Sequence, residues 1–389
     1  MELGRMKSIK FLALAGVAGV VTISAPVMSQ RSENAATQSQ GRIAGQYICV
    51  FDQNVVRRGQ VTAAANRAAN AQGGQVLYTY SNSIHGFATR ASARGVENMQ
   101  RANPWINYCV QDEIVTLAPP PGRGNGSGGG GDTSAQETPW GITRVGGFID
   151  GSGFSRRAWV LDSGIDLDHP DLNVDTARSK DFTGSRKGAE DENGHGTHVA
   201  GTIAAIDNAI GVVGVAAGAP VVAVRVLDRR GSGAYSGIIA GVDYAAGNAS
   251  AGDVANMSLG GGSYQPLNDA VQAAAAGGLH MVIAAGNDGA DASNYSPASA
   301  SGNRVYTISA IDQSDNLTSW SNYGAPVDWA EPGLGITSTW KGGGYDTISG
   351  TSMAAPHAAG ILLATGGTLR VDGYAGNDPD NQPDPIGKR

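Results

Sequence analysis

Short apolar runs alternate with Ala- and Gly-rich stretches along the larger, C-terminal part of the chain. The apolar runs lie at residues 158–161, 221–226, 254–257, 280–284 and 305–310. The stretches compatible with helices lie at residues 198–205, 237–246, 267–276 and 352–363. Strands that are apolar at every position are typical of a parallel sheet covered by helices on both faces. The pattern therefore predicts an α/β domain with a mostly parallel sheet over residues 135–366.

A different order of elements is predicted between residues 46 and 117. Strand-like runs lie at residues 46–51, 76–80, 84–88 and 106–110, and helix-compatible stretches lie at residues 61–72 and 91–101. The order strand, helix, strand, strand, helix, strand is typical of a ferredoxin-like α+β fold. We therefore expect a small domain over residues 46–117, preceded by a disordered segment at residues 30–45.

Two polar segments flank the predicted α/β domain. Residues 118–134 contain three consecutive prolines followed mostly by Gly, Asn and Ser, a composition that buries too little surface to fold. We interpret this segment as a flexible linker and a domain boundary. Residues 367–389 form a polar, acidic tail, which we expect to be disordered rather than to bind a second cation.

The chain begins with a basic segment and continues with an apolar one. Three basic residues at positions 5, 7 and 10 precede an apolar run at residues 11–23. This arrangement is typical of a secretory signal peptide, here residues 1–29. A membrane anchor is the alternative, but the run is shorter than the ~20 residues that a spanning helix needs. We expect the remainder of the chain to be secreted and free of the membrane.

Composition and charge narrow the classes of function. The 389-residue chain carries a net charge of −7, with a basic excess before residue 134 and an acidic excess after it. An acidic surface without a basic, aromatic-interleaved run disfavours nucleic acid as a partner. Cys49 and Cys109 are the only cysteines and both precede the linker, which excludes a thiol nucleophile in the α/β domain.

Three motifs in the α/β domain carry the residue types that together activate a nucleophile. Asp162 follows an apolar run, His195 lies between two glycines before a helix, and Ser352 lies at the start of another helix. A serine hydroxyl is a poor nucleophile until a base removes its proton and an acid orients that base. The order Asp, His, Ser differs from that in trypsin-type proteases and α/β-hydrolases, and it is the order found in subtilisin.

Each of these motifs also has another interpretation. His195 and His198 could be zinc ligands, although zinc proteases with paired histidines place them four residues apart with a glutamate between them. Ser352 could cap its helix and Asp162 could occupy a turn. Two further acids on the loop after Asp162, at positions 166 and 168, are expected to be solvated or to stabilise the loop.

The segments VLDSGID, NGHGTHVAG and GTSMAAPH resemble the motifs of the subtilisin-like serine proteases, and the resemblance covers roughly residues 135–365. It implies a serine endopeptidase in which Asp162 holds His195 and His195 deprotonates Ser352. It also implies that the side-chain amide of Asn287, in AAGN, and the backbone N–H of Ser352 stabilise the oxyanion.

The resemblance extends to substrate binding. Two segments resemble those that pair with an extended peptide in that family, namely Gly231, Ser232 and Gly233, and Ser258, Leu259, Gly260 and Gly261. Glycines in these segments allow a peptide backbone to approach as an added strand. The glycines at 260 and 261 imply an open pocket that accepts apolar or aromatic side chains.

The small domain resembles the inhibitory propeptide of the same family, especially at SIHGFATR and WINYCVQDEIV. We therefore expect a zymogen that cuts itself after Leu117 or Ala118, or otherwise inside the linker. The first and last strands are neighbours in such propeptides, which implies a disulfide between Cys49 and Cys109. Two unpaired thiols are the alternative.

A calcium site is the last feature that the resemblance implies. Its ligands would be the side chains of Gln136, Asp171 and Asn208 and the carbonyl oxygens of Ile206, Ile210 and Val212. Calcium prefers six to eight such oxygen ligands, although Asn208 could instead simply make a turn. The prediction is a secreted, monomeric protease of protein or peptide substrates, inhibited by its own propeptide. A catalytically silent, calcium-stabilised peptide-binding module is the alternative.

Overall fold

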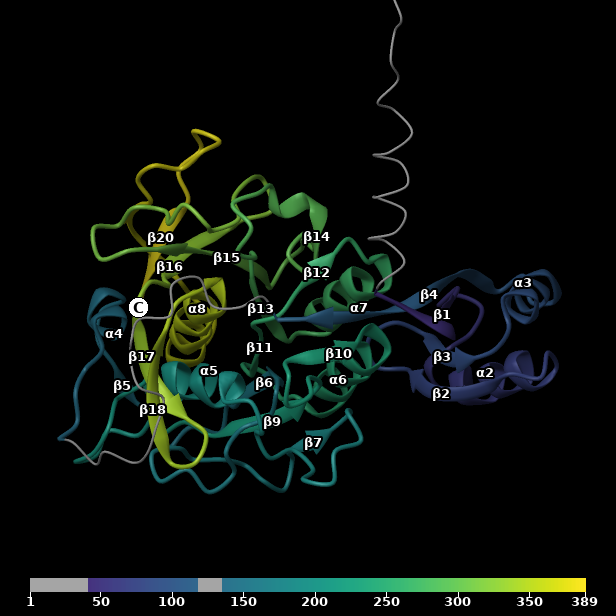
Figure 1. Ribbon diagram of the computed structural model, residues 1–389, viewed down its shortest axis with the longest axis horizontal. Coiled ribbons are helices and arrows are strands. Elements are labelled where there is room, and N and C mark those ends of the chain that lie inside the picture. Colours follow the sequence, from purple (N-terminus) through teal and green to yellow (C-terminus); the bar gives the residue numbers. More distant parts are fainter. Residues whose placement is uncertain (1–40, 118–134) are drawn as a thin grey trace, which may run out of the picture. The chain divides into compact units, whose positions relative to one another are not determined.

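A computed structural model describes residues 41–117 and 135–389 (Figure 1). The predicted signal peptide, residues 30–40 and the predicted linker lie outside the described residues. From Arg42 onward the chain forms one compact unit, with a small sheet before residue 117 and a large, mostly parallel sheet after residue 135. No helix in the described ranges is long and apolar enough to cross a membrane.

The N-terminal part combines four strands with two helices. Its elements are β1 (Arg42–Phe51), a 3₁₀ turn (Arg58–Gln60), α2 (Val61–Asn70), β2 (Gln75–Tyr80), β3 (Gly86–Arg90), α3 (Ala93–Ala102) and β4 (Ile106–Thr116). The order of strands and helices along the chain is the predicted one, and the strands lie in the order β4-β1-β3-β2. The first and last strands are therefore antiparallel neighbours, with Cys49 opposite Cys109.

The first strand begins earlier than predicted. Residues 42–45, assigned above to a disordered segment, form the start of β1, and Arg42 pairs with Glu113 of β4. The Arg42 guanidinium lies 3.3 Å from the Glu113 carboxylate. The prediction was wrong because it relied on side-chain composition, whereas the backbone hydrogen bonds of a sheet do not require apolar residues.

A nine-stranded sheet forms the larger part, in the order β19-β20-β16-β15-β13-β11-β6-β9-β7. The bounds are β6 (Ala158–Asp162), β7 (Lys180–Asp181), β9 (Val221–Arg225), β11 (Val254–Met257), β13 (His280–Ala284), β15 (Val305–Ile311), β16 (Trp329–Pro332), β19 (Arg370–Tyr374) and β20 (Pro385–Lys388). All pairs from β16 to β9 are parallel, which confirms the predicted fold class.

Helices cover both faces of this sheet, as the continuous apolar strands predicted. The helices are α4 (Trp140–Arg144), α5 (His195–Ala204), α6 (Tyr235–Asn248), α7 (Gln265–Ala276) and α8 (Thr351–Thr365), with a 3₁₀ turn at Ala292–Asn294. Trp159 and Leu161 of β6 pack with α6 and α7, whereas Ala158 and Val160 pack with α5 and α8. Successive side chains of one strand thus serve opposite layers.

Short strands complete the larger part and frame its loops. They are β5 (Ile149–Asp150), β8 (Ala216–Ala217), β10 (Ser232–Ala234), β12 (Gly261–Gly262), β14 (Tyr295–Ser296), β17 (Ile336–Trp340) and β18 (Gly344–Ile348). β17 and β18 form an antiparallel hairpin that contacts α5, and β10 pairs with β4 of the small sheet. The last contact joins the N-terminal part to the larger part.

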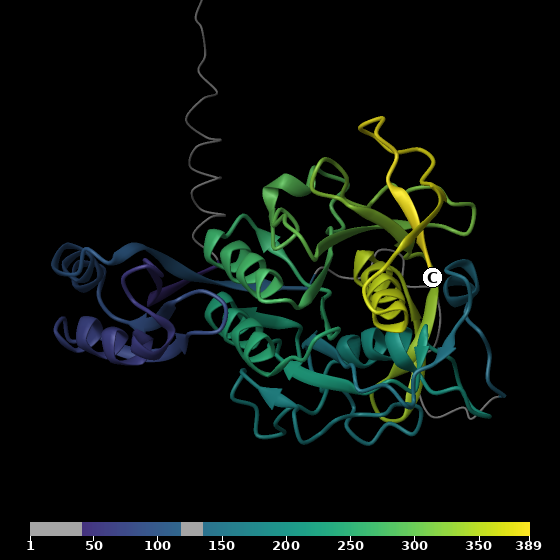
Figure 2. The same cartoon turned by 180° about the vertical axis from the view of Figure 1, so that it is seen from behind.

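Helices α6 and α7 contact each other and lie between the small sheet and the large sheet, as the two opposite views show (Figures 1 and 2). Ile48, Val50 and Tyr80 of the small sheet are buried in the same core as the apolar side chains of these helices. The N-terminal part is therefore packed on the larger one through an apolar face and not merely tethered to it.

The C-terminal segment contradicts the expectation of a disordered tail. Residues 370–374 and 385–388 form β19 and β20, which extend the large sheet beyond β16. Ile386 is fully buried, and Arg144 of α4 binds the Asp372 carboxylate at 3.0 Å. The polar composition was misleading because one buried isoleucine and a set of ion pairs suffice to fix a segment that docks on an existing sheet edge.

Candidate active site

Asp162 and His195 are brought together by the ends of two buried elements. Asp162 is the last residue of β6, and His195 is the first residue of α5. The Nδ1 atom of His195 lies 2.8 Å from Oδ1 and 3.0 Å from Oδ2 of Asp162. Gly194 precedes the histidine with φ of 115°, and any side chain there would strike the ring of Trp340, so this turn requires glycine.

The surroundings of His195 favour its charged form. Burial of the imidazole lowers the pKa of His195, but the Asp162 carboxylate and its hydrogen bond raise that pKa further than burial lowers it, with a contribution from Asp191. The net pKa is above the ordinary value for histidine. A proton received at Nε2 is therefore stabilised by the carboxylate behind the ring.

Asp191 is a buried acid that the sequence analysis did not single out. Its Oδ1 accepts hydrogen bonds from the Ser163 hydroxyl at 2.9 Å and from the backbone N–H of Gly194 at 2.9 Å. Its Oδ2 accepts from the Thr197 hydroxyl at 2.7 Å. The carboxylate thus ties the residue after Asp162 to the first turn of the helix that carries His195. An acid just before a helix start is the only signal the sequence offers for this role.

Ser352 is the second residue of α8, because the helix begins at Thr351, one position before the predicted start at residue 352. The N-cap is Gly350, whose φ of 155° favours glycine, so the alternative of Ser352 as helix cap is not realised. Helices α5 and α8 contact each other. In this structure the Ser352 hydroxyl donates to the carbonyl oxygen of Ser258 at 3.2 Å and not to His195.

Asn287 follows β13 and is oriented by the residue before Ser352. Its Oδ1 accepts hydrogen bonds from the N–H and the hydroxyl of Thr351, both at 2.9 Å. A Cβ placed on Gly350 would lie 3.5 Å from Nδ2 of Asn287 and 3.6 Å from the backbone N of Ser352. The two predicted oxyanion donors therefore flank the same small space. Thr351 was not foreseen, because its hydroxyl becomes important only through this long-range contact.

The predicted substrate segments border the end of β4. Thr116, Val115 and Ile114 pair antiparallel with Ser232, Gly233 and Ala234, and the N–H of Leu117 donates to the carbonyl oxygen of Gly231 at 2.9 Å. A cavity of about 230 Å³ adjoins this strand. Its lining includes the following predicted residues together with the strand end: Thr116, Leu117, Ser258, Leu259, Gly260, Gly261, Asn287 and Ser352.

The register of β4 directs alternate side chains into the cleft. Val115 is buried, and a Cβ on Gly261 would lie 3.3 Å from it. A Cβ on Gly231 would lie 3.0 Å from the Leu117 side chain, whereas Ile114 is exposed. An extended peptide thus already adds to the edge of β10, in the manner of β-strand addition.

The side chains predicted to bind calcium gather on one side of α5. The Asp171 carboxylate accepts from Nδ2 of Asn208 at 2.7 Å and from the N–H of Val212 at 3.2 Å, and Oε1 of Gln136 accepts from the N–H of Asn208 at 2.5 Å. Asp171 is fully buried, and its burial raises the pKa of its carboxyl. No ion pair of Asp171 with Lys or Arg exists within residues 41–117 and 135–389.

This donor set fits a hard cation. It consists of carboxylate, amide and carbonyl oxygens, which calcium prefers, and a cation would offset the uncompensated buried charge of Asp171. The carbonyls of Ile206, Ile210 and Val212 belong to the loop that pairs with the segment around Gln136, at bridges from Ala135 to Ile210 and from Glu137 to Val212.

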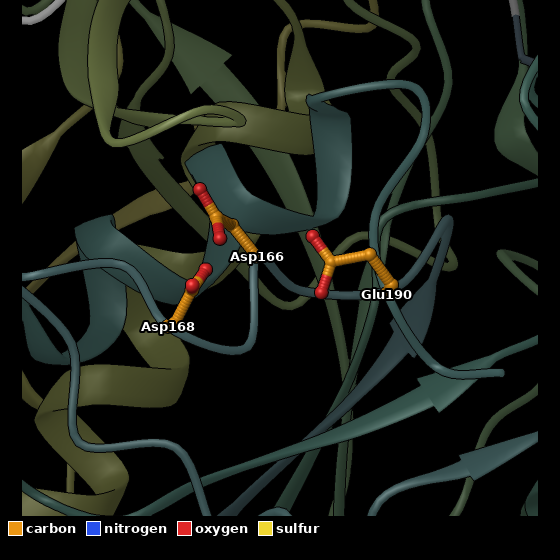
Figure 3. Close-up of side chains that lie close together, drawn as sticks. All are labelled: Asp166, Asp168 and Glu190. Carbon is orange, nitrogen blue, oxygen red and sulfur yellow. The ribbon is translucent and has the colours of Figure 1, made fainter. Parts of the chain in front are cut away.

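A second acidic group lies on the loop after Asp162. One carboxylate oxygen each of Asp166, Asp168 and Glu190 lies within 4.8 Å of the others, and the three side chains point toward one another in Figure 3. Asp166 is buried and accepts from the N–H of Gly343 at 2.9 Å, while Asp168 is exposed. The group could hold a metal ion, and Asp166 and Asp168 also help to fix their loop.

The zinc interpretation of the two histidines is wrong. His198 is fully buried, and its Nε2 lies 3.0 Å from the carbonyl oxygen of Ile336. Burial lowers the pKa of His198 to about 3, which keeps it neutral and structural. His195 is already held by Asp162, and the two histidines do not form a ligand group in the part of the chain that the structure describes.

The two cysteines are joined. Cys49 of β1 and Cys109 of β4 lie opposite each other across the small sheet and form a disulfide that closes a separation of 60 residues. Free thiols are therefore absent from the described residues. The bond fixes the two strands that lead from the start of the small sheet to the segment in the cleft.

The sequence is similar to those of known proteins. A sequence model of the subtilase family matches residues 159–365. Alkaline serine exoprotease A of Vibrio alginolyticus is 38% identical over 337 residues, which are 82% of this chain and 60% of that protein. Proteinase R of Parengyodontium album is 36% identical over 350 residues, which are 86% of this chain and 83% of that protein.

A solved structure resembles the fold. The crystal structure of a cold adapted subtilisin-like serine proteinase superimposes with a TM-score of 0.57 and 39% sequence identity. The superposition covers 64% of this chain and 96% of that chain. The family model spans the strands from β6 to β16 and the three motifs that contain Asp162, His195 and Ser352.

Proposed function

The chain belongs to the subtilase family of serine proteases, and from this premise we propose that it is a secreted serine endopeptidase made as a zymogen that cuts itself. One observation carries the proposal above the others. The Asp162 carboxylate holds Nδ1 of His195, which leaves Nε2 as the base for a nucleophile. Ser352 and the two proposed oxyanion donors lie at the start of α8. They border a cavity that is also lined by the end of the extended strand β4.

The first chemical step is attack on the peptide carbonyl. Nε2 of His195 takes the proton of the Ser352 hydroxyl as Oγ bonds to the carbonyl carbon, and the imidazolium formed is stabilised by Asp162. The negative charge moves to the carbonyl oxygen. That oxygen accepts hydrogen bonds from Nδ2 of Asn287 and from the backbone N–H of Ser352 at the start of α8. The helix N-terminus adds a favourable potential there.

The remaining steps return the serine to its starting state. His195 gives its proton to the amine nitrogen as the peptide bond breaks, and the N-terminal half of the substrate stays bound to Ser352 as an ester. Water then takes the place of the amine. His195 removes a proton from the water, and the ester breaks to release the acid and restore the Ser352 hydroxyl.

The small sheet has the contacts expected of an intramolecular inhibitor. Oδ1 of Asp243, on α6, accepts from the backbone N–H groups of Ser81, Asn82 and Ser83 at 2.7–2.8 Å. The Tyr80 hydroxyl donates to the carbonyl oxygen of Ser236 at 3.0 Å. These contacts hold the small sheet on α6 while its last strand fills the cleft, so that substrate is excluded.

Self-processing is proposed after Leu117 or Ala118, or otherwise in the linker. Leu117 is the last described residue before the linker and lines the cavity beside Ser352. The test is N-terminal sequencing of the protein recovered from the medium after expression of the full chain. We expect a mature N-terminus between residues 118 and 135. A protein that starts near residue 30 and hydrolyses peptides would remove self-processing from the proposal while leaving the peptidase in place.

Replacing Asn287 with alanine is expected to lower kcat by about 10²–10³-fold, because one of two preorganised oxyanion donors is lost. KM should change little, since the amide acts on charge that develops only in the transition state. Steady-state kinetics on a peptide amide substrate, with the mature enzyme, measures both quantities. The control is Asn294→Ala in an exposed turn, which should retain wild-type kinetics. An Asn287→Ala enzyme with unchanged kcat would contradict the assigned donor.

We also propose that calcium binds Gln136, Asp171, Asn208 and the carbonyls of Ile206, Ile210 and Val212. The ion would compensate the negative charge of the buried Asp171 carboxylate. It would also fix the loop after α5. Removing it with a chelator is expected to lower Tm by about 5–10 °C, from a site filled at about 100 times its Kd. Calorimetry with and without the chelator checks this, and added calcium should restore Tm.

Two variants separate this site from the acidic group of Figure 3. Asp171→Asn should make Tm insensitive to the chelator, whereas Asp168→Asn should leave the calcium dependence unchanged. The opposite pattern, with Asp168→Asn abolishing the response, would transfer the stabilising ion to the group of Asp166, Asp168 and Glu190.

A further inference from the structure

The carboxyl group of Glu331 is buried without a partner. Glu331 lies on β16 and is fully inaccessible to solvent. Neither of its carboxylate oxygens has a hydrogen-bond partner among the described residues. A buried carboxylate in that state costs several kcal/mol, so the group is expected to keep its proton. No step of the proposed catalysis uses it.

The C-terminal segment forms the cover over this carboxyl. A Cβ on Gly387 of β20 would lie 2.1 Å from Oε1 of Glu331 and 2.7 Å from the side chain of Leu369. The carboxyl therefore abuts the backbone of β20 directly. β20 itself is joined to β16 through a single residue pair, from Ala330 to Ile386. The segment that seals Glu331 from water is thus held to the sheet by few backbone contacts.

The charged groups around this point do not neutralise Glu331. The ionisable residues of the elements packed against β16 here are Arg144 of α4, His357 of α8, Asp372 of β19 and Lys388 of β20. Arg144 binds Asp315 at 2.7 Å and Asp372 at 3.0 Å, and Lys388 binds Asp372 at 3.0 Å. Burial lowers the pKa of His357 to about 4, so it is neutral.

A second acid of the C-terminal segment is also buried. Oδ2 of Asp384, just before β20, accepts a hydrogen bond from the Ser309 hydroxyl of β15 at 2.6 Å. Burial, together with repulsion from Asp378, Asp380 and Asp328, raises the pKa of Asp384 to about 7, against the lowering effect of the Ser309 hydrogen bond. Burial likewise raises the pKa of Glu331 well above its ordinary value, against the attraction of Arg144. The pKa values of both acids are therefore raised in the closed state.

We propose that β19 and β20 form a latch on the large sheet that is closed while Glu331 is protonated and opens when it ionises. Opening lets the carboxylate reach water by displacing β20, the element in contact with it, and leaves β16 as the sheet edge. Asp384 contributes in the same sense at lower pH. Ionisation of Glu331 therefore separates β19 and β20 from the large sheet, independently of the catalytic residues.

The direction of the pH dependence of latch docking follows from the raised pKa of the buried carboxyl groups in the closed state. Docking of the latch is fully stabilised below the pKa of the exposed carboxyl, about 4.3, and is lost as pH rises through the higher pKa of the closed state. Between these two pKa values, each carboxyl that is protonated in the closed state and ionised in the open state raises the open fraction about tenfold per pH unit. Asp384 adds to this rise only up to about pH 7, and Glu331 adds to it as long as the closed state keeps its proton.

Cleavage by trypsin after Arg370 reports the open fraction, because Arg370 lies on β19 and a strand must leave its sheet to be cut. The parent is the full chain with Ser352→Ala, which cannot digest itself. Its rate of cleavage, divided by that of Ser352→Ala/Glu331→Gln at the same pH, cancels the pH dependence of trypsin. Mass spectrometry of the fragment 371–389 gives the rate.

We expect this ratio to rise with pH, by up to about tenfold per pH unit while the closed state keeps Glu331 protonated. Asp384→Asn, added to both the parent and the Glu331→Gln reference, should leave this slope unchanged. The control is Asp372→Asn, which breaks the exposed ion pairs of the latch and should raise cleavage equally at every pH. A ratio that does not change with pH would overturn the proposal, even if all variants fold and are cut.

Discussion

A Ser352→Ala variant is expected to lose peptidase activity by about 10⁶-fold in kcat, the loss typical of a serine protease without its nucleophile. The full chain should then accumulate as a precursor, because the cut that separates the small sheet requires the same hydroxyl. The fold should persist, since Ser352 makes only hydrogen bonds of its Oγ to the Ser258 carbonyl and of its carbonyl to the Ser258 hydroxyl, and alanine retains the second.

Activity on a peptide amide substrate and the size of the protein on a gel measure these two effects together. Ser349→Ala is the matched control, because Ser349 lies three residues earlier and its hydroxyl only accepts from the N–H of Gly335. That variant should mature and hydrolyse peptides. An active or self-processed Ser352→Ala protein would refute the assignment of the nucleophile.

An Asp162→Asn variant is expected to lose about 10⁴-fold in kcat while KM stays nearly constant. The amide nitrogen of asparagine donates to Nδ1 of His195, so that the ring carries its proton on Nε2 and cannot accept one from Ser352. The shape of the site is unchanged, because asparagine and aspartate are nearly isosteric. The loss therefore falls on the chemical step rather than on substrate binding.

The pH profile of this variant supplies a second readout. The Asp162 charge holds the pKa of His195 above its ordinary value, so its removal should move the acid limb of kcat/KM to lower pH. Asp168→Asn, which changes an exposed acid of the following loop, should shift neither kcat nor the limb appreciably. A profile of Asp162→Asn that coincides with wild type would show that Asp162 does not act on His195.

The residues of the proposed catalytic site could be placed from the sequence because each of them lies at a marked end of an element. Asp162 ends an apolar strand, His195 follows a glycine that only a tight turn needs, and Ser352 opens a helix of small residues. In a parallel sheet such ends meet at one edge. The order Asp162, His195, Ser352 along the chain then indicated the subtilisin-like family.

The residues that orient this constellation were not predictable in the same way. Asp191 acts through Ser163 and Thr197, and Thr351 acts through the Oδ1 of Asn287. These contacts are made by side chains whose sequence neighbours give no periodic or compositional signal. They exist only once the chain has folded and distant segments have met.

The order of the C-terminal segment could not be predicted from its composition. Residues 367–389 have few apolar positions, and composition alone favours disorder. The segment is ordered because Ile386 fills a small core with Ile311 and Ala330, and because Arg144 binds its Asp372. A buried Glu331 on the neighbouring strand gave no signal either, since a lone glutamate in a polar stretch is normally exposed.

The most direct test of the account is labelling of the mature wild-type protein with a fluorophosphonate, followed by mass spectrometry of the peptide that carries the label. The account predicts one label per chain, on Ser352, and about the same loss of labelling rate as of kcat in Asp162→Asn. Absence of label from Ser352 in a protein that hydrolyses peptides, or labelling of another residue, would contradict the claim that Asp162 and His195 activate Ser352.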